Sequence, residues 1–294
     1  MQILPVVSVL VTVYNREKYL AETISSILRS TYQKYEVIVV DDNSSDDSLA
    51  IARSMAELDQ RVRVYANEEN LGDYGNRMKA ASLARGRYIK YVDSDDLIYP
   101  HSLAIMVESM EQYPDAALAL AHSMPEDESP YPWRLSPEEV YKKHFLGRGC
   151  LSCGPTGAII RREAFEAIGG FDKTWGVLAD IDLWLRLSAS WPVVLLPPGL
   201  VWWRRHEEQE FTKDDAHAVY LQRGYELNKN VLGSEECPLS VHERATALER
   251  IHQHFARRLL SFALKNRRVR SAIRIYNSAD LSVMALIKGF GRYK

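Results

Sequence analysis

The sequence predicts an α/β protein with a mostly parallel mixed central sheet flanked by helices. In the first hundred residues, short runs rich in β-branched residues alternate with segments whose apolar residues recur at helical spacing. The first run, residues 6–13, is continuous enough for a strand that is covered on both faces. This short, regular alternation of strand and helix favours a parallel sheet.

The elements follow one another in a simple order along the chain. Strands of the first hundred residues are expected at 6–13, 37–40, 62–65 and 88–92. The helices between them are expected at 17–29, 46–58 and 73–84, the last closed by Gly86. Further on, the pattern predicts a proline-rich loop at 124–137, a strand at 158–160, and helices at 162–168 and 181–188. Beyond about residue 212 the pattern is helical, with helices expected at 216–230, 242–264, 269–276 and 281–287.

The charge is distributed unevenly, although the net value over 294 residues is only −2. Residues 251–294 hold ten Lys and Arg residues and one acid, a local charge of +9, which leaves −11 for residues 1–250. A near-neutral chain excludes a general attraction to nucleic acid. The basic C-terminal helices either contact an anionic membrane surface, pair with a second subunit, or pack on the rest of the chain with a solvated basic face.

Three cysteines, Cys150, Cys153 and Cys237, are too few for a disulfide framework. The odd number and the absence of an apolar signal segment predict a cytoplasmic protein, peripheral at the inner membrane face if the basic helices bind lipid. Cys150 and Cys153 form a C-x-x-C pair, but a second pair of zinc ligands is missing, which favours buried small hydrophobes. No apolar run reaches the ~20 residues that a bilayer span requires.

Polar side chains follow two of the expected strands. Residues 41–44 read D-D-N-S and residues 93–96 read D-S-D-D. The carboxyl ends of parallel strands meet at one edge of a sheet, where ligands bind. A helix cap would explain one such residue, for example Ser45 or Asp46, but not the whole cluster. Three carboxylates within four residues repel one another unless a cation neutralises them, so the second cluster predicts a cation site.

An ordered set of motifs over residues 6–206 resembles the inverting family 2 of nucleotide-sugar glycosyltransferases with the GT-A fold. The motifs are residues 8–15 (S-V-L-V-T-V-Y-N), 39–46 (V-V-D-D-N-S-S-D), 70–72 (N-L-G), 91–96 (Y-V-D-S-D-D), 169–172 (G-G-F-D), 180–186 (D-I-D-L-W-L-R) and 204–206 (R-R-H). A single D-x-D recurs by chance, whereas this ordered set is specific.

The resemblance implies a domain organisation and a reaction. A GT-A domain is expected over residues 1–210, with a nucleotide-binding half at 1–100 and an acceptor-binding half at 101–210, and a helical extension over 211–294. The expected reaction is inverting, cation-dependent transfer of a sugar from a nucleotide diphosphate sugar, with UDP as the expected nucleotide. The acceptor would be a hydroxyl of a carbohydrate or lipid-linked molecule, in cell-surface polysaccharide or glycolipid synthesis.

The family motifs also imply the residues of a donor site. Along the nucleotide, the resemblance places Thr12, Tyr14, Asn15, Asp42, Arg77, Asp93 and Ser94. The Asp42 carboxylate would accept a hydrogen bond from an N–H of uracil, because a carboxylate only accepts. Asp95, with Asp93, would hold Mn²⁺ or Mg²⁺ on the diphosphate. His206 is expected as a further cation ligand or diphosphate contact, with a solvated histidine as the alternative.

Inversion requires a base that takes the acceptor proton, and the resemblance assigns this role to Asp180. The residue alone would also fit a plain N-cap of the helix at 181–188. Two positions depart from the family: Ala179 stands where Glu is usual, and Met78 stands where Asn is common. The missing Glu leaves the donor and acceptor specificity open.

The acceptor side carries weaker signals. The glycines around Gly154 predict close backbone approach there. Tyr131 and Trp133 would stack on sugar rings, unless their segment is a plain surface loop. A nucleotide-sugar-binding protein of the same fold without transferase activity is the alternative function. Phosphatases that use an aspartyl phosphate are disfavoured because the D-x-D follows the fourth strand, and dehydrogenases because no G-x-G-x-x-G follows the first.

Overall fold

A computed structural model describes residues 4–121, 129–207, 216–265 and 268–279. Their contacts divide the chain into two compact units, Met1–Val140 with Cys150–Arg204, and Tyr141–Gly149 with Arg205–Lys294. The helix expected at 281–287 lies outside the described residues. The functional division expected near residue 210 stays a prediction.

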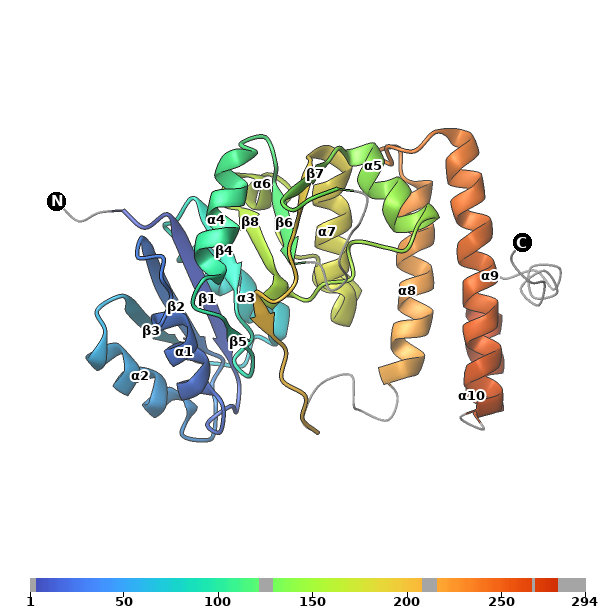
Figure 1. The fold of residues 1–294 in the computed structure, drawn as a ribbon. Helices are drawn as coiled ribbons and strands as arrows, with labels where there is room; N and C mark the ends of the chain where they lie inside the picture. Colours follow the sequence, from blue (N-terminus) through green and yellow to red (C-terminus); the bar gives the residue numbers. More distant parts are fainter. Residues whose placement is uncertain (1–3, 122–128, 208–215, 266–267, 280–294) are drawn as a thin grey trace. The chain divides into compact units, whose positions relative to one another are not determined.

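The first unit is built on an eight-stranded mixed sheet (Figure 1), with strand order β3-β2-β1-β4-β8-β6-β9-β7. The strands are β1 (Val7–Val13), β2 (Tyr35–Asp41), β3 (Val62–Ala66), β4 (Tyr88–Tyr91), β6 (Leu118–Ala121), β7 (Trp133–Leu135), β8 (Ala158–Arg161) and β9 (Val193–Leu196). β1 runs parallel to β2 and β4, β2 to β3, and β6 to β9, whereas β8 is antiparallel to both its neighbours and β7 is antiparallel to β9. The predicted mostly parallel mixed sheet is confirmed.

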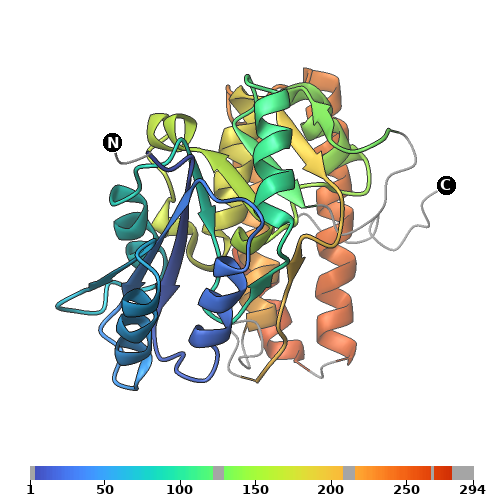
Figure 2. The same ribbon diagram turned by 60° about the vertical axis from the view of Figure 1, so that its left-hand side comes forward.

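Helices cover both faces of this sheet (Figure 2). They are α1 (Leu20–Leu28), α2 (Ser48–Leu58), α3 (Asp73–Ser82), α4 (Ser102–Gln112), α6 (Arg162–Ala167) and α7 (Ala179–Ser190). Alternate residues of β1, such as Val9 and Val11, pack with Ile24 of α1 and Met106 of α4, while α3 packs on β1 and β2 from the other face. β1 is therefore covered on both faces, as its β-branched run predicts.

Two local predictions were wrong. The helix expected from residue 17 begins at Leu20, because the backbone N–H of Glu17 donates to the Asp46 carboxylate and that of Asp47 donates to the Glu17 carboxylate. These reciprocal bonds hold residue 17 outside the helix. The segment expected to be only a loop contains β7, an edge strand that begins directly after Pro132, where proline is tolerated. Of that segment, residues 124–128 lie outside the described residues.

The second unit contains three long helices, α8 (Ala216–Gly233), α9 (Val241–Lys265) and α10 (Val269–Ser278). They pack around a separate apolar core that includes Leu221, Tyr225, Phe255, Leu259 and Ile275. The helices expected at 216–230, 242–264 and 269–276 are thus present. Within the described residues, no helix has the length and apolar character needed to cross a membrane.

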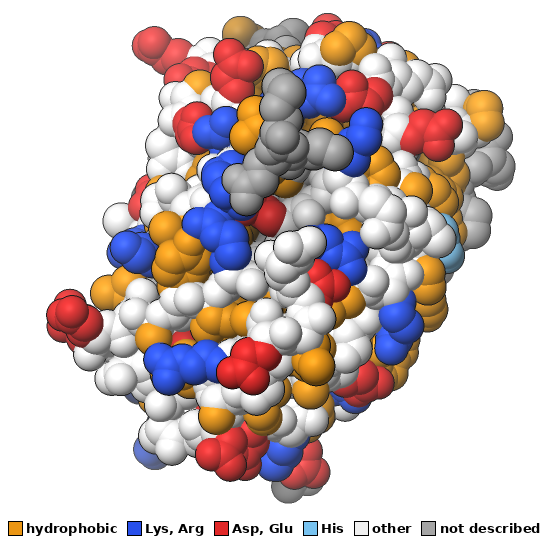
Figure 3. All heavy atoms as spheres, turned by 90° about the vertical axis from the view of Figure 1, so that its left-hand side faces the viewer, with side chains coloured by type: hydrophobic (Ala, Val, Ile, Leu, Met, Phe, Trp, Pro, Cys, Tyr) orange, Lys and Arg blue, Asp and Glu red, His pale blue; other side chains and the backbone are white. Residues whose placement is uncertain are grey.

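Acidic and basic side chains are mixed over the face of the molecule in Figure 3. The negative excess of residues 1–250 therefore does not form one continuous acidic surface on that side. Part of it is neutralised inside the sheet, where the buried Glu36 of β2 accepts hydrogen bonds from Ser8 at 2.7 Å and from the Arg85 guanidinium at 2.6 Å. Burial raises the pKa of Glu36, but the bonds from Arg85, Ser8 and Arg63 outweigh it and lower the pKa overall.

Gly86 marks a close approach between the turn before β4 and the backbone of β1. Its N–H donates to Ser8 Oγ at 2.8 Å, and a Cβ at this position would lie 2.5 Å from Ser8 N and 2.7 Å from Val7 C. Both atoms belong to the backbone of a buried strand and cannot move aside.

Replacing Gly86 by alanine is therefore expected to lower the free energy of unfolding by about 2 kcal/mol, in the range of overpacked cores. Urea unfolding followed by circular dichroism measures the effect. Gly233→Ala is the matched control, because its new methyl group meets no atom within 4 Å. An unchanged urea midpoint for Gly86→Ala would contradict the close approach.

Candidate active site

The sheet brings the predicted strand ends to one edge. Val13 at the end of β1 pairs with Asp41 at the end of β2, and the N–H of Asp42 donates to Val13 O at 2.8 Å. The half-buried Thr12 is the penultimate residue of β1, and the exposed Tyr14 directly follows the end of this strand. The predicted nucleoside-side residues are thus brought together.

Two asparagines at this edge have left-handed backbone conformations, Asn15 with φ 52° and Asn43 with φ 61°. Asparagine tolerates this region better than most residues. The Asn15 Oδ1 accepts a hydrogen bond from the N–H of Ser45 at 2.9 Å, and the N–H of Asn15 donates to Ser44 Oγ at 3.0 Å. These bonds fix the two loops to each other.

Asp42 is almost completely buried, and its carboxylate accepts three hydrogen bonds. The donors are Asn67 Nδ2 at 2.8 Å, the N–H of Leu71 at 2.8 Å and the N–H of Gly72 at 3.0 Å. A carboxylate has about four acceptor positions, so one further N–H can be accommodated. One remaining acceptor position is enough for a single N–H of a nucleotide base.

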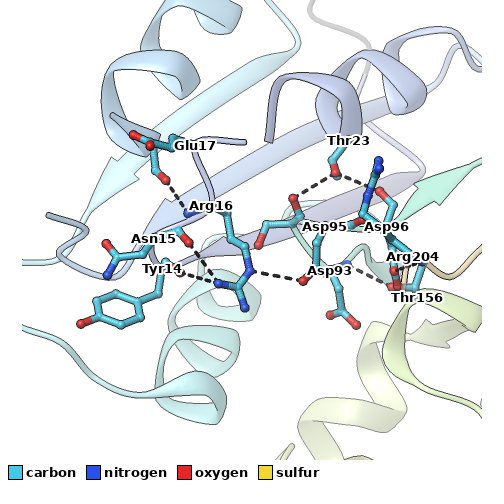
Figure 4. A network of polar contacts seen from close by, with 12 residues as sticks. Tyr14, Asn15, Arg16, Glu17, Thr23, Asp93, Asp95, Asp96, Thr156 and Arg204 are labelled. Carbon is cyan, nitrogen blue, oxygen red and sulfur yellow. Dashed lines mark hydrogen bonds and ion pairs between the residues drawn. The ribbon is translucent and has the colours of Figure 1, made fainter. Parts of the chain in front are cut away.

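The acidic loop, residues 93–96, follows β4 at the same edge and is surrounded by arginines (Figure 4). Arg16 Nε lies 3.2 Å from Asp95 Oδ2, and Arg77 Nη2 lies 2.8 Å from Asp93 Oδ1. The Arg204 Nε donates to Asp95 O at 2.8 Å. Neutralisation, which the sequence assigned to a metal ion alone, is therefore provided in part by arginine. Arg204 stands in the motif at 204–206, whereas nothing in the sequence pattern identified Arg16.

The acidic loop is not a helix cap. The N-cap of α4 is His101, five residues beyond the acidic loop, and it makes no side-chain capping bond. Burial raises the pKa of Asp96 to about 7, and the charge of Asp93 acts in the same direction. The Asp96 carboxylate accepts from the N–H of Arg204 at 3.1 Å.

The residues of the acidic loop suit a hard cation. Among the described residues, no cluster of three or more Asp, Glu, His and Cys side chains could by itself hold a metal ion. Mg²⁺ commonly uses one or two carboxylates together with phosphate oxygens of a bound nucleotide. Asp93 and Asp95 can offer these two carboxylates. His206 belongs to the second unit, and its part in cation binding stays a prediction. Ser94 is buried, with its carbonyl held by Thr23 at 3.0 Å.

Arg77 is fixed to the acidic loop from α3. Its guanidinium is almost completely buried over the rings of Tyr74 and Tyr91, at 5.7 and 5.6 Å from their centroids. Nε and Nη2 bond Asp73 and Asp93, but Nη1 is buried without a hydrogen-bond partner among the described residues. An unsatisfied buried donor of this kind suits an anionic ligand.

Asp180 lies in the first turn of α7 and is not the N-cap, which is Leu178. Its Oδ1 accepts the N–H of Ile181 at 2.7 Å. Burial raises the pKa of Asp180 to about 7, the positive charge of Arg77 opposes this, and Asp93 and Asp73 add to it. The side chain of Ala179 is fully buried, so position 179 offers no group to a substrate.

The acceptor-side predictions fare differently. A Cβ at Gly154 would meet no atom within 4 Å, so the space beside it is open. Trp133 lies on β7, four strands from β4, or about 19 Å at the usual strand spacing. The structure does not bring Trp133 to the acidic loop, and its contact with an acceptor stays a prediction, as does that of the half-buried Tyr131.

The three cysteines are free thiols. Cys150 and Cys237 are buried, and Cys153 is partly buried. Burial raises the pKa of Cys153 to about 12, which keeps this thiol protonated.

Comparisons with known proteins identify the family of this chain. A family model described as glycosyl transferase family 2 matches residues 8–169. Glycosyltransferase GlyG of Streptococcus pneumoniae is 37% identical over 123 residues, which cover 42% of this chain and 40% of GlyG. The putative glycosyltransferase EpsE of Bacillus subtilis is 31% identical over 185 residues, which cover 62% of this chain and 66% of EpsE. The chain thus spans less than two thirds of the length of these relatives.

Two solved structures share the fold. TarS 1–349 of S. aureus, in complex with UDP, has a TM-score of 0.64 and 20% identity, covering 88% of this chain and 75% of that chain. The mannosyltransferase PcManGT of Pyrobaculum calidifontis, in complex with GDP-Man and Mn²⁺, has a TM-score of 0.67 and 18% identity, covering 98% of this chain and 79% of that chain.

The raised pKa of Asp180 makes a testable statement about stability. The folded protein holds this proton more tightly than the unfolded chain, so the stability linked to it is present below about pH 4 and is lost as the pH rises through 7. Asp180→Asn is therefore expected to be more stable than the wild type at pH 8, by about 2 kcal/mol after allowance for partial exposure. Urea unfolding at pH 4.5 and pH 8 measures the difference.

Asp172→Asn is the control with the opposite sign, because hydrogen bonds from Thr174 lower the pKa of Asp172. Its loss of stability should be present at pH 8 and should fade only as the pH falls below about 4. A difference between Asp180→Asn and wild type that does not change with pH would show that Asp180 has an ordinary pKa.

Proposed function

Because this chain belongs to glycosyl transferase family 2, we propose that it transfers a sugar from a nucleotide diphosphate sugar to an acceptor hydroxyl, with inversion at the anomeric carbon. One observation carries the proposal. The half-buried Asp180, whose pKa burial raises to about 7, lies within electrostatic reach of Arg77 and of Asp93 in the acidic loop. The proposed proton acceptor, Asp180, thus lies near Arg77, the group proposed to bind the anionic diphosphate.

The donor is expected to bind along the edge formed by β1 and β2. Thr12, Tyr14 and Asn15 would line the nucleoside, and the remaining acceptor position of Asp42 would take a base N–H. The free Nη1 of Arg77 would donate to the diphosphate. UDP is the expected nucleotide, a choice supported by the UDP and UDP-GlcNAc complexes of TarS. Because PcManGT was solved with GDP-Man, GDP-sugars are also tested as donors.

Asp93 and Asp95 would hold Mn²⁺ or Mg²⁺, Ser94 would lie along the nucleotide, and His206 is proposed as a further cation ligand. A bound cation supplies neutralisation of the charge that develops on the departing diphosphate. The Mn²⁺ in the PcManGT complex supports this choice of ion. The cation would replace part of the ion pair between Arg16 and Asp95.

Asp180 would act as the general base. Above pH 7 its carboxylate is ionised and can take the proton of the acceptor hydroxyl. The acceptor oxygen then forms the new bond to the anomeric carbon as the bond to the diphosphate breaks, and the nucleoside diphosphate leaves with the electron pair. One displacement of this kind inverts the configuration.

The acceptor is expected to be a carbohydrate or a lipid-linked molecule, bound beside the open space at Gly154, with Trp133 as an outlying contact. We place the reaction in cell-surface polysaccharide or glycolipid synthesis at the cytoplasmic face of the membrane. The alternative, a nucleotide-sugar-binding protein without transferase activity, draws on Ala179, where the family usually has Glu.

We propose that α10 supplies a docking surface for an anionic membrane. Ala272 and Ile275 are buried in the second unit, but Val269 and Ile273 on the next stripe are 52% and 55% exposed. The exposed Arg270 and Arg274 follow these two residues by one position each. An apolar stripe beside a basic one is the pattern of helices that lie on anionic lipid. A symmetric dimer through this face would instead bring its arginines together.

Reversing the charge of the docking surface with Arg270→Glu and Arg274→Glu should weaken binding to vesicles of phosphatidylglycerol and phosphatidylcholine by at least about 30-fold, since each basic residue contributes about 1 kcal/mol. Flotation assays measure this. Arg53→Glu with Lys79→Glu makes the same change of net charge on α2 and α3 and should bind like the wild type. Equal binding of wild type to uncharged vesicles, or a concentration-dependent dimer that these arginine substitutions strengthen, would contradict membrane docking.

Catalysis is tested with UDP-glucose, UDP-galactose, UDP-GlcNAc and GDP-mannose, with and without Mn²⁺, by release of nucleoside diphosphate. Binding is screened first by melting shifts, because a ligand of the folded state raises the midpoint. Asp180→Asn is expected to lower kcat by about 10³-fold while nucleotide binding is kept. Wild-type kcat should fall as the pH drops below about 7, because Asp180 gains its proton there.

The control is Asp115→Asn, which removes an exposed carboxylate paired with Arg134 and should leave kcat unchanged. Full turnover by Asp180→Asn would overturn the assignment of the base. Binding of UDP with no turnover of any donor would favour the binding-protein alternative.

A further inference from the structure

The segment 153–157 lies between the two groups that the proposed reaction needs. At its start, Trp184 Nε1 donates to Cys153 O at 2.7 Å. Trp184 follows Asp180 by four residues on α7, so the two side chains leave the helix on the same face. The beginning of the segment is therefore fixed to the helix that carries the proposed base.

At its end, the same segment is fixed to the acidic loop by Thr156. The N–H of Asp93 donates to Thr156 Oγ1 at 3.0 Å (Figure 4), and the nearby Thr156 hydroxyl lowers the pKa of Asp96 against the effect of burial. The Thr156 oxygen accepts the Asp93 N–H with a lone pair, which leaves the hydroxyl proton available to the nearby Asp96 carboxylate. Thr156 is only 4% exposed and Asp96 only 2%, so water cannot readily replace the Thr156 hydroxyl.

The sheet register explains why a side chain is needed there. β4 and β8 pair only at Tyr88 with Arg161 and at Ile89 with Ile160. Continuing that register would set Asp93 opposite Thr156, but β8 begins only at Ala158 and Thr156 lies in the short helical turn Pro155–Gly157, so the ladder does not reach it. The Thr156 hydroxyl thus takes the N–H of Asp93 where no backbone carbonyl is available.

A second side chain closes the gap between the parted strands. Lys90, on β4, is fully buried, and its Nζ donates to the carbonyl of Thr156 and, at 2.9 Å, to that of Tyr91. Thr156 is therefore held through both its hydroxyl and its carbonyl. Because Thr156 is held in this way, a shift of the segment 153–157 would also shift the acidic loop.

We propose that Thr156 is a positioning residue that sets the place of the acidic loop relative to Asp180. The inference rests on the proposed function, in which the acidic loop holds the leaving diphosphate and Asp180 takes the proton. A displacement in line requires these two groups on opposite sides of the sugar, and an error of about 1 Å costs about 10²-fold in rate. Without the hydroxyl, Asp93 loses the side-chain hydrogen bond that fixes the acidic loop to the segment 153–157.

The test compares Thr156→Val, which removes the hydroxyl at nearly constant shape, with Thr156→Ser, which keeps it. For the valine variant we expect kcat to fall by about 10²-fold. Calorimetry with MnCl₂ and UDP should show weaker Mn²⁺ binding to the UDP complex by about tenfold, the effect expected when a group that orients metal ligands is lost. Binding of UDP without cation should be unchanged, and the serine variant should recover most of both losses.

The matched control is Ser109→Ala on α4. It also deletes a buried hydroxyl, one that donates to Ile105 O at 2.7 Å in the same unit. It should lower the melting temperature but leave kcat and Mn²⁺ binding as in the wild type, which separates positioning from general stability. Thr156→Ala replaces the valine variant if the latter does not fold.

The outcomes separate this inference from the proposed function. If the wild type turns over a donor and the valine variant keeps both kcat and Mn²⁺ binding, the positioning role is overturned and the transferase stands. Failure of the serine variant to recover also overturns it. If the wild type binds UDP and Mn²⁺ but turns over no donor, the proposed function fails, and the Mn²⁺ calorimetry of the Thr156 variants decides the inference by itself.

Discussion

The acidic loop places three carboxylates within four residues of chain, at the edge where β1, β2 and β4 end. Carboxylates so close repel one another, so the loop is stable only where positive groups reach it. These groups come from separate places: Arg16 follows β1, Arg77 lies on α3, and Arg204 follows β10 (Val201–Trp202). The connection after β1, the helix α3 and the end of β10 must all meet at this edge, and that requirement organises the first unit.

Most of the sheet could be predicted from the sequence because its signal is local. The strand expected at 88–92 forms within one residue of its predicted bounds, since a β-branched and aromatic run between turn residues specifies a strand by itself. β7 could not be predicted, because its three residues follow a proline-rich segment and become a strand only by pairing with β9. The start of α1 at Leu20 depends on bonds between residues 17 and 46, about thirty positions apart.

The site residues also fall into two groups, those that a local sequence motif identifies and those that only the three-dimensional structure identifies. The acidic loop and Asp180 stand in motifs that can be read in sequence, and the sheet brings the strand ends together as expected. Arg16, Lys90 and Thr156 carry no such signal, because a single arginine, lysine or threonine gains meaning only from what the topology sets opposite it. For this reason the sequence assigned all neutralisation of the acidic loop to a metal ion.

Arg77 explains how one edge can hold two carboxylates with different tasks. Its buried guanidinium forms an ion pair with Asp93, the residue proposed as a cation ligand. The same charge acts on Asp180 without a bond, and there it only moderates the effect of burial, which leaves a pKa of about 7. A carboxylate in direct contact with a fixed cation is a weak proton acceptor, whereas one governed by burial can gain and lose a proton near neutral pH. Distance from a single arginine therefore separates the proposed metal ligand from the proposed base.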